Sequence, residues 1–176
     1  RRRLMESLAA INYSRVIAGG APKFIGLTYP ANYSADPASW KRDLDAFGKR
    51  FMRFYPDAFF HWRLEFQVRG APHFHLIVFN TRWVDKNWLS QTWYSIVGSG
   101  DIKHKHAGTS ISNIRSQRGV FSYASKYLGK VSTVLAGLKV GRLWGIVGRE
   151  NYRKFVNKTS IELDVGTFCK VRRTLA

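Results

Sequence analysis

Two histidines at alternate positions, His73 and His75, form the pattern in this sequence that most clearly indicates chemistry. They begin an apolar, β-prone run, and residues two apart on a strand project from the same face. The run before them is also strand-like, and Glu65 and Gln67 share one of its faces. A hairpin that pairs these faces would bring the imidazoles close to an oxygen ligand. Such donors bind Mg²⁺ or Mn²⁺ and, equally, Zn²⁺, so the pattern predicts a divalent metal site.

A second pattern contains two tyrosines, each followed three residues later by a lysine: Tyr123 with Lys126, and Tyr127 with Lys130. On a helix, residues four apart are neighbours, so the two phenols lie on one face. Nearby ammonium groups favour the phenolate and can hold a phosphate, which predicts a tyrosine nucleophile. The alternative is that both rings pack in the core, although this helix carries other apolar side chains for packing.

The elements that must position these residues follow from apolar periodicity and turn signals. The segment 69–72, Arg-Gly-Ala-Pro, favours a turn, so the strands around it are expected to form a hairpin. Strands are predicted at 23–29, 59–68, 73–79, 109–114 and 143–147. Helices are predicted to start at Pro37 and after Asp85, and a third is predicted at 119–130. Strands separated by helices, with a hairpin among them, indicate a mainly antiparallel α+β fold.

The charge of the chain is strongly one-sided. Lys and Arg number 29 against 11 Asp and Glu, a net charge of +18, and no acidic residue occurs between Ile102 and Arg149. Such a stretch cannot neutralise itself, so it is expected to form a positive surface for nucleic acid rather than for a membrane. The basic residues expected to contact the nucleic acid are Lys103, Lys105, Arg115, Arg118, Arg142 and Arg149.

Composition excludes several classes of protein. Apolar residues make up 45% of the chain and aromatic residues 15%, which a disordered basic tail would not contain. The sequence shows neither an apolar run long enough for a membrane helix nor a signal-peptide pattern, so we expect one cytoplasmic domain over residues 1–176. The single Cys169 excludes an internal disulfide and a zinc site with several cysteines.

Three ordered motifs together resemble the HUH endonuclease superfamily, specifically the rolling-circle replication initiators of phages and plasmids. The first is the segment 24–29, a strand that ends in a small hydroxyl residue and a tyrosine. The second runs from Glu65 to the pair His73 and His75, with its metal-binding pattern of histidine, hydrophobic residue and histidine. The third, at 123–130, has the two-tyrosine form seen in microvirus-type initiators.

The resemblance implies a ferredoxin-like or RRM-like α+β fold, with a central antiparallel sheet of about five strands and flanking helices. His73 and His75 would lie on a middle strand, with the helix of Tyr123 and Tyr127 beneath its exposed face. Family members take a third metal ligand from a Glu or Gln on the partner strand. Glu65 fits that role, and Gln67 is the alternative ligand. The implied metal is Mg²⁺ or Mn²⁺.

The implied substrate is single-stranded DNA at a replication origin, often beside or within a hairpin. A tyrosine would attack the scissile phosphate with the help of the metal, giving a 5′-phosphotyrosine and a free 3′-hydroxyl, and the reverse attack would religate the strand. Lys126 and Lys130 would neutralise or orient the phosphate, and either tyrosine could attack first. The sequence has no G-x-x-x-x-G-K-[ST] P-loop, so unwinding and synthesis are expected from a host helicase and polymerase.

Other interpretations explain less of the sequence. A non-catalytic module that binds single-stranded nucleic acid would explain the charge and the aromatic residues, but not the metal-ligand pattern or the tyrosine pair. A zinc hydrolase would give the tyrosines no role. Relaxases and single-strand transposases share the HUH chemistry, but the two-tyrosine helix favours an initiator. Outside these motifs, His61 is expected to be structural, and His104 and His106 are expected to be solvated loop residues.

Overall fold

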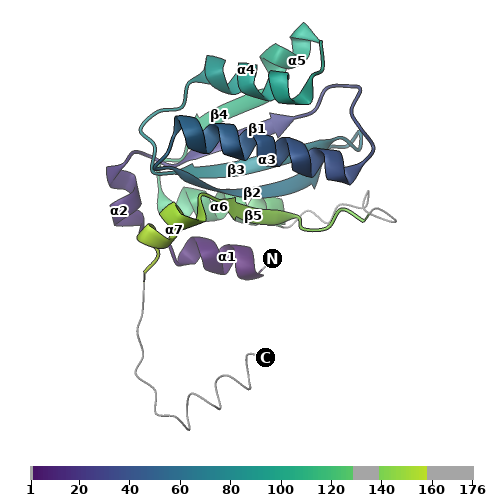
Figure 1. Cartoon of the computed structure of the whole chain (residues 1–176). Coiled ribbons are helices and arrows are strands. Elements are labelled where there is room, and N and C mark those ends of the chain that lie inside the picture. Colours follow the sequence, from purple (N-terminus) through teal and green to yellow (C-terminus); the bar gives the residue numbers. More distant parts are fainter. Residues whose placement is uncertain (1, 129–138, 158–176) are drawn as a thin grey trace.

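An antiparallel sheet of five strands forms the centre of the computed structural model, which describes residues 2–128 and 139–157 (Figure 1). The strands are β1 (Lys23–Thr28), β2 (Phe59–Phe66), β3 (Pro72–Phe79), β4 (Thr109–Asn113) and β5 (Trp144–Val147). They lie in the order β4-β1-β3-β2-β5, and every neighbouring pair is antiparallel. The predicted strands are therefore present, and the histidine strand β3 is the middle one.

The described residues also form seven helices. They are α1 (Arg2–Ala9), α2 (Tyr13–Ala18), α3 (Pro37–Phe54), α4 (Lys86–Val97), α5 (Ile102–Ala107), α6 (Gln117–Leu128) and α7 (Arg149–Phe155). None of these helices is both long and apolar enough to cross a membrane. From β1 to β4 the chain alternates as strand, helix, strand, strand, helix, strand, with α5 added after α4. This order is ferredoxin-like, so the predicted α+β fold is confirmed.

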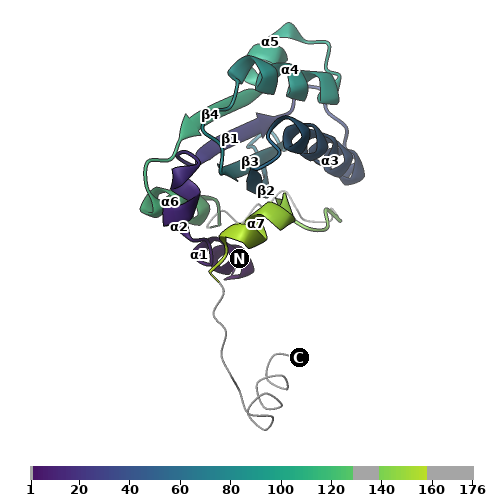
Figure 2. The ribbon, with the colours of Figure 1, turned by 60° about the vertical axis from the view of Figure 1, so that its left-hand side comes forward.

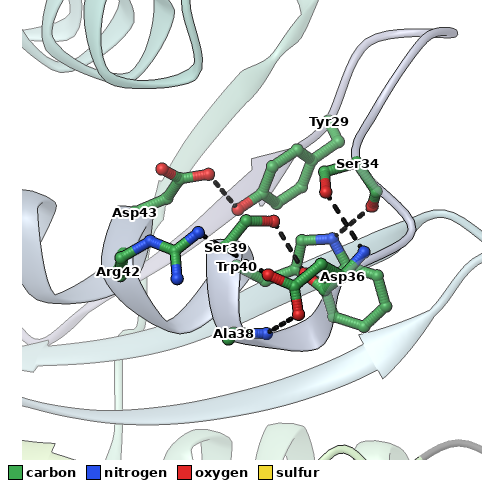
Figure 3. Close-up of polar contacts among 8 residues, drawn as sticks. All are labelled: Tyr29, Ser34, Asp36, Ala38, Ser39, Trp40, Arg42 and Asp43. Atoms are coloured by element: carbon green, nitrogen blue, oxygen red, sulfur yellow. Dashed lines mark hydrogen bonds and ion pairs between the residues drawn. The ribbon is translucent and has the colours of Figure 1, made fainter.

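Helix α3 begins at a cap that the sequence encodes (Figure 3). Asp36 accepts a hydrogen bond from a backbone N–H of the first turn, and Pro37 fits that turn because its missing N–H would have no partner there. The Trp40 indole donates to the carbonyl of Ser34 at 2.7 Å, and the Tyr29 hydroxyl donates to a carboxylate of α3 at 2.8 Å. These contacts fix the loop that leads from the end of β1 into α3.

One face of the sheet packs against α3 and α4 (Figure 2). Because side chains alternate along a strand, Phe74, Leu76 and Val78 of β3 all point to this face, where they are fully buried. They pack in one core with Phe47 of α3 and Trp93 of α4, whose ring centroids lie 6.1 Å apart in an edge-on contact. This core holds β3 in place from one side.

The opposite face carries a second core and changes in character along β3. Ile77 and Phe79 are buried here, in a core with Leu8 of α1 and with residues of α2 and α6 (Figure 2). His73 and His75 continue the same face, but they are only partly buried. The face therefore has an apolar half beneath the helices and a polar half beyond them.

Helix α5 shows that the expectation of a solvated loop around His104 and His106 is wrong. Asp101 caps the helix by accepting a hydrogen bond from the N–H of Lys103 at 2.8 Å. His104 is buried on this helix, whereas His106 is exposed. The cap makes a helix of a segment whose basic, polar composition resembles a loop.

His61 lies in the apolar half of the second face, as expected for a structural residue. It is 2% exposed, and its ring meets the rings of Phe79 and Tyr152 edge-on. Its Nε2 lies within hydrogen-bonding distance, 3.1 Å, of the Ser7 hydroxyl of α1. Burial lowers the pKa of His61 from 6.5 to about 3, because the charged imidazolium would lose its hydration.

Replacing His61 with glutamine should flatten the dependence of stability on pH. The folded protein keeps this imidazole neutral down to about pH 3, whereas the unfolded chain binds a proton below about pH 6.5. The free energy of unfolding should therefore fall as the pH drops through this window, by up to about 1.4 kcal/mol per pH unit more in the wild type than in His61→Gln. Urea unfolding across the window measures both slopes, and equal slopes would contradict the neutral, buried state of His61.

Candidate active site

His73, His75 and Glu65 come together on the polar half of the second face. In the ladder between β2 and β3, Glu65 is paired with His73 and Arg63 with His75. His75 Nε2 lies 3.1 Å from Glu65 Oε2, and the ring centroids of His73 and His75 are 4.3 Å apart. The structure thus brings together the two imidazoles and the carboxylate that the sequence pattern selected.

The neighbouring strand β1 accommodates the His73 ring because it carries a glycine at position 26. Gly26 is paired with His75 across the β1–β3 ladder. A Cβ atom on Gly26 would lie 3.3 Å from His73 Nε2 and 2.7 Å from the Ser110 hydroxyl oxygen. A side chain there would displace the imidazole or the β4 hydroxyl, so the glycine in the first motif is explained by close packing of the ring across β1.

Thr28, the hydroxyl residue at the end of β1, holds the His73 ring. Its Oγ1 lies 2.8 Å from His73 Nδ1, which makes Nε2 the ring nitrogen that would bind a metal. The backbone of Thr28 is fixed from the other face of the sheet, because its carbonyl accepts hydrogen bonds from Trp93 Nε1 and His104 Nε2, both at 2.8 Å. The orientation of His73 therefore depends on contacts made by α4 and α5.

The same contacts give His104 a structural role. A carbonyl oxygen can only accept, so His104 Nε2 carries the proton that it donates to Thr28, and Nδ1 accepts from the Ser99 hydroxyl at 2.9 Å. Both ring nitrogens are thus used within the fold. His104 is therefore not placed as a metal ligand or a DNA contact.

Arg63 is a site residue that sequence reasoning missed. Its Nε lies 3.5 Å from Glu65 Oε1, and the two side chains are only 15% and 11% exposed. Glu65 Oε1 is buried and has no hydrogen bond within the described residues, so the ion pair with Arg63 and the contact with His75 hold this carboxylate. Strand parity was the available signal, because Arg63 shares the face of Glu65.

Gln67, the alternative ligand, is placed differently. It lies just beyond the end of β2, and its Oε1 accepts a hydrogen bond from Arg69 Nε at 2.9 Å. Arg69 in turn donates to the carbonyls of Tyr29 and Pro30, which ties the β2–β3 turn to the end of β1. The side chain of Gln67 is thus engaged in the turn, so the geometry favours Glu65 as the third ligand.

The tyrosine helix meets the histidine strand through a stack of three rings. Phe24 of β1 stacks on His75 with ring centroids 5.3 Å apart, and Tyr123 of α6 stacks on Phe24 at 4.7 Å. Tyr123 is half-buried in this position. The stack places α6 on the same face of the sheet as the two histidines.

Tyr127 lies one helical turn further along α6. The segment before α6 adjoins the start of β1, where the N–H of Ile114 donates to the carbonyl of Pro22. The helix then passes Phe24, so it runs toward the Thr28 end of β1. Four residues advance a helix by about 6 Å, which carries the backbone of Tyr127 closer to that end. The side chain of Tyr127 and the whole of Lys130 lie outside the described residues.

The basic residues are spread over several elements rather than gathered beside the histidines. Lys126 is exposed on α6. Among the predicted nucleic-acid contacts, Lys103 and Lys105 lie on α5, Arg115 and Arg118 around the start of α6, Arg142 before β5, and Arg149 at the start of α7. These elements adjoin opposite edges of the sheet, so the six residues do not form one patch.

The donor set of the site was tested against the requirements of a metal. Within residues 2–128 and 139–157, no three His, Cys, Asp or Glu side chains are arranged to hold a metal ion. In the site, Glu65 and His75 share a hydrogen bond with each other, while His73 is bonded to Thr28. Two imidazoles and a carboxylate on adjacent strands are nevertheless ligands that Mg²⁺ and Mn²⁺ accept. The residues therefore fit a cation in their chemistry.

Comparison with known proteins places the chain in a family. No curated protein and no solved structure gave a significant match to the chain. A family model of the replication-associated proteins of the ORF2/gene II protein type matches residues 22–132. This match covers more than half of the chain and includes β1, the β2–β3 hairpin and α6. The chain therefore belongs to the replication-associated protein family of the ORF2/gene II protein type, whose members are phage rolling-circle replication initiators.

Proposed function

We propose that this chain nicks and rejoins single-stranded DNA at a replication origin. The observation that carries the proposal is the ring stack from His75 through Phe24 to Tyr123, because it puts a tyrosine helix and a candidate metal-binding strand on one face. Family membership supports a role in starting rolling-circle replication. The net charge of +18 supports a polyanionic substrate, with the exposed basic residues of α5, α6 and α7 as proposed phosphate contacts.

His73, His75 and Glu65 are the proposed ligands of Mg²⁺ or Mn²⁺. When bound, the ion supplies a Lewis acid that makes the phosphorus of a phosphodiester more electrophilic. The contribution of the protein is to fix the donors. Thr28 orients the ring of His73 through Nδ1, and Arg63 orients the carboxylate of Glu65.

A tyrosine hydroxyl of α6 is the proposed nucleophile. Its oxygen forms a bond to phosphorus while the bond between phosphorus and the 3′-oxygen breaks, and the proton lost by the phenol goes to the departing oxygen. The products are a 5′-phosphotyrosine and a free 3′-hydroxyl. Because the ester bond is conserved, attack by a 3′-hydroxyl reverses the step and rejoins the strand. Lys126 and Lys130 are proposed to neutralise or orient the phosphate.

Tyr123 and Tyr127 are both candidates for the nucleophile. If both react, one can cut the regenerated origin while the other still holds the first 5′ end. The free 3′-hydroxyl is a primer, so a host polymerase and a host helicase are the proposed partners, in the cytoplasm of a bacterial host. The competing function is a module that binds single-stranded DNA without cutting it, which the charge and the aromatic residues alone would also support.

Removing either histidine should abolish metal-dependent cleavage. His73→Ala or His75→Ala takes away an imidazole donor, so cleavage of origin DNA in Mn²⁺ should fall by about 100-fold or more. Affinity for the same DNA should change little, because phosphate contacts supply most of it. Pooled single-stranded oligonucleotides from the replicon that encodes the protein are incubated with Mn²⁺ or EDTA and run on a denaturing gel.

The matched control for this experiment is His106→Ala, which removes an exposed histidine from α5. Cleavage that survives in His73→Ala and His75→Ala would exclude these residues as metal ligands. Tight binding of origin DNA by the wild type without any covalent band would favour the binding module.

Substitution of the tyrosines with phenylalanine should separate a mechanism with one nucleophile from a mechanism with two. Phenylalanine has no hydroxyl, so it cannot form the phosphate ester. With one nucleophile, either Tyr123→Phe or Tyr127→Phe alone removes the covalent band, whereas with two only the double variant does. Peptide mass spectrometry maps the adduct, and Tyr94→Phe on α4 is the control. A covalent product in the double variant would show that another residue attacks.

Loss of the Thr28 hydroxyl should weaken metal binding without unfolding the protein. Thr28→Val removes the hydrogen bond to His73 Nδ1 but keeps the shape of the side chain, so the affinity for Mn²⁺ should fall by about 10-fold. Calorimetric titration with Mn²⁺ measures this change. Thr28→Ser keeps the hydroxyl and should bind like the wild type. Equal affinity in the valine variant would show that Thr28 does not orient the ligand.

A further inference from the structure

A basic recess lies at the β4 edge of the sheet, between β4 and the segment that leads into α4. Its volume is about 490 Å³, and its lining includes Lys23, Arg82, Trp83, Lys86, Ser112 and Asn113. Lys23 and Thr28 are the two ends of β1, roughly 16 Å apart at about 3.3 Å per residue. The α4 side of the recess also belongs to the face of the sheet opposite the histidines. The recess is therefore separate from the candidate active site.

Trp83 presents its indole to solvent from a fixed backbone. The residue is 64% exposed, although tryptophan is usually well buried. The chain is anchored on both sides of it, because Val84 is buried and Thr81 donates its hydroxyl to the carbonyl of Trp83 at 2.8 Å. A tryptophan held in this way offers a flat, apolar face on which another ring can stack.

Cations flank this indole. Arg82 and Lys86 are both exposed at the recess. Their acidic neighbour Asp85 is engaged as the cap of α4, where it accepts hydrogen bonds from two backbone N–H groups. Lys23 adds positive charge from within the wall, with its ammonium group donating to two backbone carbonyls. The recess therefore favours a ligand with negative charge.

The far wall of the recess is the edge strand β4. Ser112 and Asn113 are exposed on it, and a hydroxyl and an amide can each both donate and accept hydrogen bonds. A stacking face, flanking cations and neutral polar groups match the three parts of a nucleotide: the plane of the base, the phosphate and the polar edge of the base.

We propose that this recess binds an unpaired nucleotide of single-stranded DNA, with its base stacked on Trp83 and its phosphates beside Arg82 and Lys86. The inference rests on the proposed function only in taking single-stranded DNA as the partner. A strand that leaves the histidine face around the β4 edge reaches the recess. The recess extends the bound length of DNA and takes no part in cleavage.

The test measures binding in EDTA, so that cleavage plays no part. Fluorescence anisotropy is recorded with labelled oligo-dT of increasing length. Trp83→Ala should weaken binding of the long oligonucleotides by about 5- to 30-fold, which corresponds to about 1 to 2 kcal/mol at 1.4 kcal/mol per tenfold change. Trp83→Phe keeps a ring and should retain most of the affinity. Phe54→Ala is the matched control, because Phe54 is an exposed aromatic residue beside Arg50 and Arg53, at a different recess.

The salt dependence supplies a second readout. Arg82→Gln should make the slope of log K against log[salt] shallower by about 0.7, the change expected for one lost contact to a single-stranded phosphate. Unchanged affinity in Trp83→Ala, or an equal loss in Phe54→Ala, would overturn the assignment of the recess. An unchanged slope in Arg82→Gln would do the same. These outcomes leave the covalent-band experiment unaffected, so failure of the recess and failure of the nicking function can be told apart.

Discussion

The register between β3 and its two neighbours is the constraint on which the rest of the site depends. Glu65 of β2 and Thr28 of β1 both pair with His73, so the imidazole stands between a carboxylate on one side and a hydroxyl on the other. A slip of one residue would turn His73 and His75 onto the face that α3 and α4 cover. The alternate apolar side chains of β3 oppose such a slip, because it would bring them out of their buried core.

One face of the sheet therefore serves both stability and chemistry. Its apolar half, with Ile77 and Phe79, is covered by helices, and its polar half carries the candidate ligands. Because Glu65, His73 and His75 all lie on paired strands rather than on loops, the backbone fixes their spacing. The helices on the opposite face add to this by holding the carbonyl at the end of β1.

The features that were predictable from sequence are those that local pattern encodes. Parity along 73–79 put the two histidines on one face, and side-chain caps located the starts of α3 and α4. Contacts between distant segments were not predictable: the burial of His104 requires the carbonyl of Thr28, and the ion pair of Arg63 requires the β2–β3 register. The helices α1, α2 and α7 are too short to show a clear periodicity and depend on packing against the sheet.

The contact between Tyr123 and Phe24 is a stack of rings, and this sets how the tyrosine can move. The attraction between stacked rings changes slowly when one ring slides across the other, whereas a hydrogen bond weakens steeply as its angle departs from linear. The tilt of the Tyr123 ring is thus restrained while small sideways displacements cost little. For the proposed nucleophile, such lateral play lets the phenolic oxygen follow a phosphorus atom as its bonds lengthen and shorten, in the cutting step and in the rejoining step alike.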